Sequence, residues 1–202
     1  MALRPPAPPR RPVRAAASGG PARVRAFEGV TRLSGAREAL LGALDSGAGV
    51  GEAAEELRAE AARAGAAPPL SAVVGRWRLR WTRQGPDAGL LQRALTSVGE
   101  SVQEVGSGGS LANVAAAGPL RVRLDAAWRE AGGGEDGALR LEVESSAVEV
   151  RLGPMTRRAE VGKRPEPGWL DVAYADGEVR VSVGSGGSVF VHTRDGGEDG
   201  GG

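Results

Sequence analysis

The feature that most constrains this chain is a two-residue alternation of apolar and polar side chains that recurs across residues 73–193. Successive side chains of a strand point to opposite faces, so each run predicts a strand with one apolar and one polar face. The runs lie at residues 76–82, 120–128, 139–144, 148–152, 170–174 and 179–183, with weaker ones at 98–105 and 111–116. Residues 189–191 are all apolar, which predicts a strand covered on both sides.

Glycine-rich segments separate these runs, notably at residues 132–134, 176–177 and 184–187. Many short strands with regular turns predict a sandwich or a barrel. A single antiparallel sheet closed on itself satisfies the one-sided pattern and leaves no long exposed edge. The apolar parity shifts between residues 143 and 148, which predicts a turn or bulge near residues 145–147. We therefore expect one antiparallel β-barrel over residues 73–194.

Two short helices are predicted ahead of the barrel, over residues 34–66, giving a mainly β fold with some α. Leu33, Leu40 and Leu44 recur at helical spacing, and Ser34 is a candidate N-terminal cap. The second helix begins near Val50, and its apolar stripe is thin and rich in alanine. A stripe of this kind predicts that the helix lies on the surface of another element.

The two ends of the chain differ from its body. Residues 1–26 hold six arginines and no acidic residue, are rich in Pro and Ala, and lack a continuous apolar run. This composition is typical of an organellar transit peptide; the alternative is a disordered tail without a targeting role. Without these six arginines the chain has 20 basic and 25 acidic residues. This mildly acidic remainder lacks the excess of positive charge that is typical of nucleic-acid-binding proteins. Residues 195–202 predict a disordered, acidic, glycine-rich tail.

Several classes of chemistry are disfavoured by the residue types alone. The chain has no cysteine and one histidine, which excludes thiolate chemistry and a His-rich metal site. Two Gly-Ser-Gly-Gly segments, at 106–109 and 184–187, lack the lysine of a phosphate-binding loop and predict hairpin turns. No run of apolar residues is long enough for a transmembrane helix. We predict a protein that is not an enzyme, with no catalytic residues, no metal and no cofactor.

Three stretches of the sequence resemble one known family. They are GAREALLGALDSGAG at residues 35–49, GRWRLRWTRQGPDAGLLQRAL at 75–95 and GWLDVAYADGEVRVSVGSGGSVFVHTR at 168–194. In order and spacing they resemble the plastid lipid-associated proteins, or plastid fibrillins (plastoglobulins). The Asn-Pro that the family has after its second helix is replaced here by residues 66–69. Val183 stands where a basic residue is usual, and Ala175 where a leucine is usual.

The resemblance implies a lipocalin-like barrel in the chloroplast, at plastoglobules, thylakoids or in the stroma. It also implies contact with isoprenoid lipids, quinones or carotenoids. The predicted function is that of a structural coat or a carrier for such lipids. The alternatives are a soluble lipocalin-like carrier and an accessory partner of an enzyme that acts on quinones or lipids.

Three groups of residues are candidates for a site. Five side chains either line a ligand cavity or simply fill the core: Trp77, Leu79, Trp81, Trp128 and Trp169. Leu90 and Leu91, in the segment after the first strand, are candidates for membrane contact. Four charged residues near the C-terminus form a polar site at one end of the barrel, or else close the last hairpin through an Asp–Arg pair: Asp171, Asp176, Arg180 and Arg194.

Overall fold

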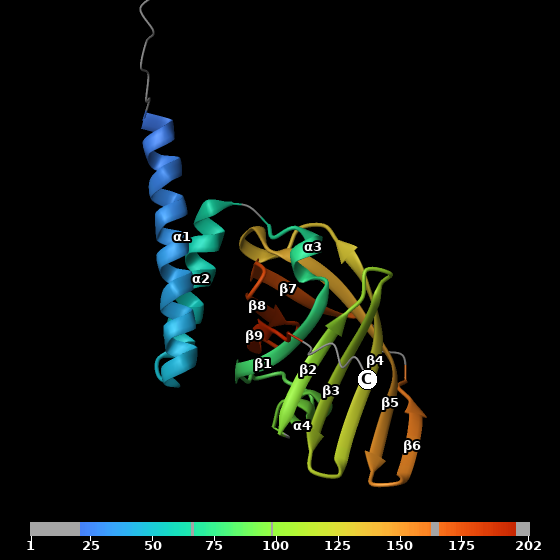
Figure 1. The fold of residues 1–202 in the computed structure, drawn as a ribbon. Coiled ribbons are helices and arrows are strands. Elements are labelled where there is room, and N and C mark those ends of the chain that lie inside the picture. Colours follow the sequence, from blue (N-terminus) through green and yellow to red (C-terminus); the bar gives the residue numbers. More distant parts are fainter. Residues whose placement is uncertain (1–20, 66, 98, 163–165, 197–202) are drawn as a thin grey trace, which may run out of the picture.

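The computed structural model describes residues 21–65, 67–97, 99–162 and 166–196, which form a β-barrel with helices packed against one side (Figure 1). The helices are α1 (Pro21–Ser46), α2 (Val50–Ala64), α3 (Leu70–Val73) and α4 (Leu90–Ser97), with a 3-10 turn η1 (Glu135–Gly137). The strands are β1 (Gly75–Arg83), β2 (Glu100–Val105), β3 (Ser110–Ala117), β4 (Leu120–Ala131), β5 (Leu139–Leu152), β6 (Met155–Glu160), β7 (Gly168–Ala175), β8 (Val179–Gly184) and β9 (Val189–Arg194).

The sheet is a closed ring of eight antiparallel strands with one further strand outside it. The strand order is β4-β3-β2-β1-β9-β8-β7-β5-β6, and an additional pairing of β4 with β5 closes the ring. Strand β5 pairs with three strands: one of its edges pairs with β4, and along the other its first residues pair with β7 and its last ones with the outer strand β6. The barrel, and the two helices that precede it, are therefore confirmed.

The strand positions follow the alternation closely. The parity shift in β5 is a bulge, because Asp125 of β4 pairs with Ala147 while Ala126 pairs with Ser145. Both Gly-Ser-Gly-Gly segments are hairpin turns, closed by hydrogen bonds from Gly106 to Ser110 and from Gly184 to Ser188. Strand β6 was not predicted, since all of its residues are exposed and it carries no apolar alternation.

Helices α1 and α2 cover the outer face of β8 and β9, as the thin helical stripe predicts (Figure 1). The buried residues of this outer cluster are Ala36, Leu40, Val50, Ala54, Leu57, Val179, Val181, Val189 and Val191. Val189 and Val191 face the helices, while Phe190 between them packs against the barrel interior. Strand β9 is therefore covered on both sides, as its continuous apolar run predicted.

Two β-bulges place aromatic side chains outside the barrel instead of inside. In β1, Leu79 pairs with His192 and Trp81 pairs with Val191, so Arg80 is an extra residue in the bulge. Side chains after it therefore point to the opposite face from the one that the alternation predicts. Trp81 therefore joins the outer cluster, and the prediction that it lines the interior is wrong. A Cβ on Gly51 of α2 would lie only 3.0 Å from the Trp81 ring, which explains the glycine there. A second bulge, in β7, sends Tyr174 to the same cluster.

The helical section begins earlier than predicted. Helix α1 starts at Pro21, so Ser34 lies inside it and does not cap it. The last residues predicted for the targeting segment, 21–26, belong to this helix, and residues 1–20 lie outside the described part of the chain. Of the predicted tail, Asp195 accepts hydrogen bonds from Arg76 and Arg78, and residues 197–202 are not described. None of the described helices is long and apolar enough to cross a bilayer.

Candidate functional site

One half of the barrel is packed, and the other half holds a cavity of about 530 Å³ that opens to solvent. We call the packed half the filled end. There the short helix α3 contacts β7, and Val73 and Trp77 pack against residues at the start of β5 and within β7. In the other half, the hollow end, helix α4 and the β8–β9 turn border the cavity. Apolar side chains that line it are Leu79, Leu95, Leu111, Leu124, Val143 and Phe190.

The predicted lining residues divide between these two environments. Leu79 and Trp128 line the cavity, and the indole N–H of Trp128 donates to the carbonyls of Gly106 and Ser110. Trp77 is fully buried in the filled end and does not border the cavity. Trp169 reaches the cavity from β7, and its ring also lies 4.4 Å from the Arg140 guanidinium. The tryptophans therefore divide three ways: Trp128 and Trp169 line the cavity, Trp77 fills the barrel core, and Trp81 packs into the outer cluster.

The inner wall between the two halves carries polar side chains from β8 and β9. Arg180 and His192 are direct cross-strand neighbours, and Ser182 follows on the same inner face of β8. All three are buried, and Arg180 is 0% exposed. The Arg180 side chain donates to Gln103 (2.5 Å), and Gln103 donates to Asn113 (2.9 Å). We call these five residues the inner polar cluster; Gln103, Asn113 and His192 line the cavity directly.

The electrostatics of this cluster are dominated by burial. Burial, and then the positive charge of Arg194, lower the pKa of Arg180 to about 9, so its guanidinium is still protonated at neutral pH. Burial, and then Arg180, lower the pKa of His192 well below its usual value, so its imidazole is neutral. The cluster therefore presents a single enclosed positive charge backed by neutral hydrogen-bonding groups.

The four C-terminal charged residues are not gathered into one site. Asp171 forms a bidentate pair with Arg140 (2.6 and 2.6 Å) between the barrel and α2. Arg194 lies 4.1 Å from the Trp77 ring and donates to the carbonyls of Val74 and Ala72, which ties β9 to the last turn of α3 and the residue after it. The predicted Asp–Arg pair of the last hairpin is not formed, because Arg180 points into the barrel.

Asp176 has the structural role of closing a hairpin, which was the alternative to a polar site. Its charged partner, Arg37, was not predicted from the sequence. Its carboxylate accepts the backbone N–H groups of Glu178 and Val179 and closes the β7–β8 turn. It also accepts hydrogen bonds from Tyr174 and from Arg37 of α1 (2.5 Å). Burial alone would raise the pKa of Asp176, but these donors together lower it.

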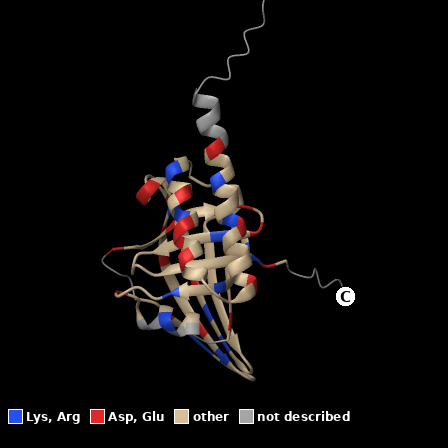
Figure 2. Ribbon diagram, turned by 90° about the vertical axis from the view of Figure 1, so that its left-hand side faces the viewer, with Lys and Arg blue, Asp and Glu red and all other residues tan. Residues whose placement is uncertain are grey.

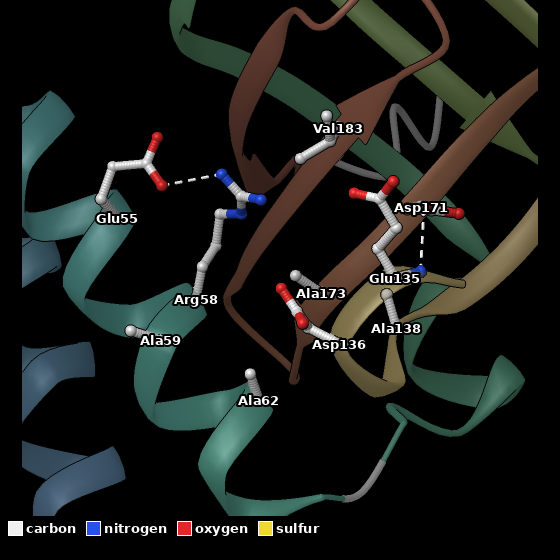
Figure 3. Close-up of a pocket in the computed structure, with 10 residues that line it drawn as sticks. All are labelled: Glu55, Arg58, Ala59, Ala62, Glu135, Asp136, Ala138, Asp171, Ala173 and Val183. Atoms are coloured by element: carbon white, nitrogen blue, oxygen red, sulfur yellow. Dashed lines mark hydrogen bonds and ion pairs between the residues drawn. The ribbon is translucent and has the colours of Figure 1, made fainter. Parts of the chain in front are cut away.

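A second, smaller cavity of about 160 Å³ lies between α2 and the outer face of β7 (Figure 3). Its lining is mostly charged and small, and includes Glu55, Arg58, Glu135 and Asp136. The carboxylate of Asp171 at its edge is already occupied by Arg140 and by the backbone N–H of Glu135. Among the described residues no group of three potential ligands is placed to hold a metal ion.

The two candidate membrane residues belong to helix α4. Leu90 and Leu91 stand in the first turn of α4, but their side chains lie outside the described part of the structure. The largest exposed apolar side chains on the barrel are elsewhere, at the joined tips of two hairpins: Val150, Leu152 and Met155, which are 39%, 47% and 64% exposed. Val150 and Leu152 belong to the alternating run at residues 148–152, which does not reveal that their side chains are exposed.

Comparison with known proteins adds no assignment. No family model matches this chain, and neither the curated proteins nor the solved structures give a match.

Proposed function

We propose that this protein is a non-enzymatic carrier that holds one small hydrophobic molecule inside its barrel. The observation that carries the proposal is the cavity of about 530 Å³ at the hollow end. Ligand sites in proteins commonly measure about 300–1,000 Å³ and combine apolar walls with a few polar groups. An eight-stranded barrel has room for side chains or for one small ligand, and here packing is confined to one half.

The finer part of the proposal rests on the resemblance of residues 35–49, 75–95 and 168–194 to plastid lipid-associated proteins. We propose that the hydrophobic molecule is a plastid lipid of the isoprenoid, quinone or carotenoid kind. We further propose that residues 1–26 direct the chain to the plastid. A fluorescent fusion with and without residues 1–26 tests the address, and loss of plastid targeting in the truncated fusion is the expected result.

Solvent extraction of the purified protein followed by mass spectrometry tests the carrier directly. A stoichiometric hydrophobic molecule is expected in the extract. Ser101→Phe, which places a large ring against the cavity, should reduce the recovered ligand strongly. Thr156→Phe is the matched control, because Thr156 is exposed on the outer strand β6. Absence of any bound lipid, together with no saturable uptake of an added one, would refute the carrier.

A second candidate, association with a lipid surface, is favoured by the hairpin tip. The β3–β4 and β5–β6 turns meet there, joined by a hydrogen bond from Gly153 to the Pro119 carbonyl (3.0 Å; Figure 1). Exposed Leu152 and Met155 lie beside arginines, and blue segments run toward this tip in Figure 2. Arg121 and Arg151 stand directly opposite each other across the strands, an arrangement of like charges that an anionic surface would relieve.

Flotation with vesicles tests this second candidate. The protein should float with vesicles that contain anionic lipid, and the double variant Leu152→Asp, Met155→Asp should stay in solution. Val30→Asp is the control, because Val30 is a 66% exposed apolar residue on α1, away from the tip. The variant Leu90→Asp, Leu91→Asp tests the earlier prediction in the same assay. Flotation that is unchanged in the tip variant would remove the tip from the proposal.

A further inference from the structure

Arg180 is a charged side chain enclosed in the barrel without a carboxylate. It is 0% exposed, and its side-chain hydrogen bond goes to the neutral amide oxygen of Gln103 (2.5 Å). Its Nε and Nη1 atoms have no hydrogen-bond partner within the described chain, and no Asp or Glu there lies within ion-pair distance of it. Its guanidinium lies 4.9 Å from the Trp77 ring, a contact that offsets only part of the burial.

The surroundings of Arg180 add positive charge and further unpartnered groups. Arg194, on the same Trp77 ring, donates to backbone carbonyls and likewise forms no ion pair in the described structure. The Ser182 hydroxyl and the Nδ1 atom of His192 are buried and unpartnered. By contrast, Arg76 and Arg78 on the outer face of β1 share the Asp195 carboxylate. Arg180 and Arg194 thus bring two positive charges to the inner side of β8 and β9 without a carboxylate partner among the described residues.

Leaving such a group unpaired is unfavourable. An ionised side chain taken out of water is destabilising unless an opposite charge and hydrogen bonds compensate it. A guanidinium does not escape this by losing its proton at neutral pH, and the lowered pKa of Arg180 is still about 9. Two neighbours of Arg180, Gln103 and His192, line the cavity, and of the two carboxylates that also line it Glu142 pairs with Arg129 and Glu144 is exposed. The missing negative charge therefore belongs on the cavity side.

We infer that the ligand of this barrel is an acidic lipid: a hydrophobic chain that ends in an ionised carboxylate. The carboxylate meets Gln103, Asn113 and His192 at the inner polar cluster, with Arg180 behind them as its counter-charge. The chain extends along Leu79, Leu124 and Phe190 toward the open side. The inference rests on the proposed carrier function and narrows it, because a neutral hydrocarbon would leave the charge of Arg180 uncompensated.

A comparison of matched ligands tests the acidic-lipid ligand separately from the carrier function. Oleate, oleyl alcohol and acetate are titrated into the full chain, and binding is followed by intrinsic tryptophan fluorescence, to which Trp128 on the cavity wall contributes. A hydrogen bond to a charged group contributes about 1.5–3 kcal/mol, so oleate should bind about tenfold or more tightly than the alcohol. Acetate should not bind measurably, since it lacks the chain.

Gln103→Glu is the informative variant, because it keeps the shape of the side chain and supplies Arg180 with an internal carboxylate. It should abolish the preference, so that oleate binds no more tightly than oleyl alcohol. Arg180→Met should do the same if it folds, which circular dichroism reports. Glu104→Gln is the control, since Glu104 is next to Gln103 but pairs with Arg123 on the outer face.

Each outcome has a separate meaning. Equal binding of oleate and oleyl alcohol overturns the acidic lipid and keeps the carrier. Failure of both to bind overturns the carrier as well. A preference for oleate that persists in folded Gln103→Glu shows that the carboxylate lies elsewhere, and so overturns the assignment to the inner polar cluster.

Discussion

The filled end and the hollow end are built from the same strands, but side chains fill the interior at the first and border a cavity at the second. At the filled end, Trp77, Leu141 and Val172 are fully buried among other apolar side chains. At the hollow end, Leu79, Leu124 and Phe190 are only partly buried and face a cavity. Interiors are normally packed as densely as organic crystals, so a void of this size is a feature that packing alone does not explain. Stability should therefore be concentrated at the filled end, and binding at the hollow end.

Strand β8 makes the same contrast between its two faces. Its valines point outward into the cluster beneath α1 and α2, whereas Arg180 and Ser182 point into the barrel. In an ordinary one-sided sheet the apolar face is the inner one. Here the helices supply an apolar cover outside, which frees the inner face of β8 to carry polar groups.

Truncating Trp77 should give the largest loss of stability. Trp77→Ala removes the largest side chain of the filled end and also leaves the guanidinium groups of Arg180 and Arg194 without their ring. The free energy of unfolding should fall by about 3–5 kcal/mol. Urea denaturation measures this change. Trp169→Ala at the cavity rim should have a clearly smaller effect, and equal effects would contradict the division into two ends.

A matched pair of leucine truncations tests the division more closely. Leu141→Ala at the filled end should lower the free energy of unfolding by about 2–5 kcal/mol, as expected for a fully buried leucine. Leu79→Ala should lower it by only about 1 kcal/mol, because Leu79 already borders an open cavity and buries less apolar area. The same two proteins, titrated with oleyl alcohol, should show the opposite order for loss of binding.

The sequence predicts the barrel well because alternation is a local property of each strand. Most strand positions, the bulge in β5 and the doubly covered strand β9 follow from it. Alternation defines two faces but not which face is inside, so the inward direction of Arg180 could not be read from it. The bulges at Arg80 and Ala173 depend on pairing with distant strands, which is why Trp81 was assigned to the wrong side.

The cavity itself was beyond reach of the sequence for a related reason. A tryptophan that fills a core and one that lines a void have the same pattern, and the difference depends on how eight strands close. One feature of the sequence did bear on the direction of the Arg180 side chain. The thin apolar stripe of α2 requires an apolar partner face, and Val179 and Val181 of β8 form that face. The residues that alternate with those valines along β8, Arg180 and Ser182, then point into the barrel.

Charged side chains at the two ends give the smallest effects on stability, and the pH sets the size of the effect at Asp176. Asp176 at the filled end has a lowered pKa, so its contribution is present above the ordinary Asp value of 3.8 and is lost as the pH falls through the folded value. Asp176→Asn keeps acceptors for the turn but loses the ion pair with Arg37, and should lower stability by about 1 kcal/mol at pH 7.

Measured by urea unfolding from pH 7 downward, the difference between Asp176→Asn and the unmodified protein should shrink as Asp176 becomes protonated. Glu100→Gln, the control, removes a 73% exposed carboxylate that pairs with Arg78 (3.2 Å) at the start of β2. Exposed pairs of this kind contribute about 0–1 kcal/mol, so this variant should be near neutral at every pH. A larger loss from Glu100→Gln than from Asp176→Asn would mean that electrostatic stability is not concentrated where α1 meets the filled end.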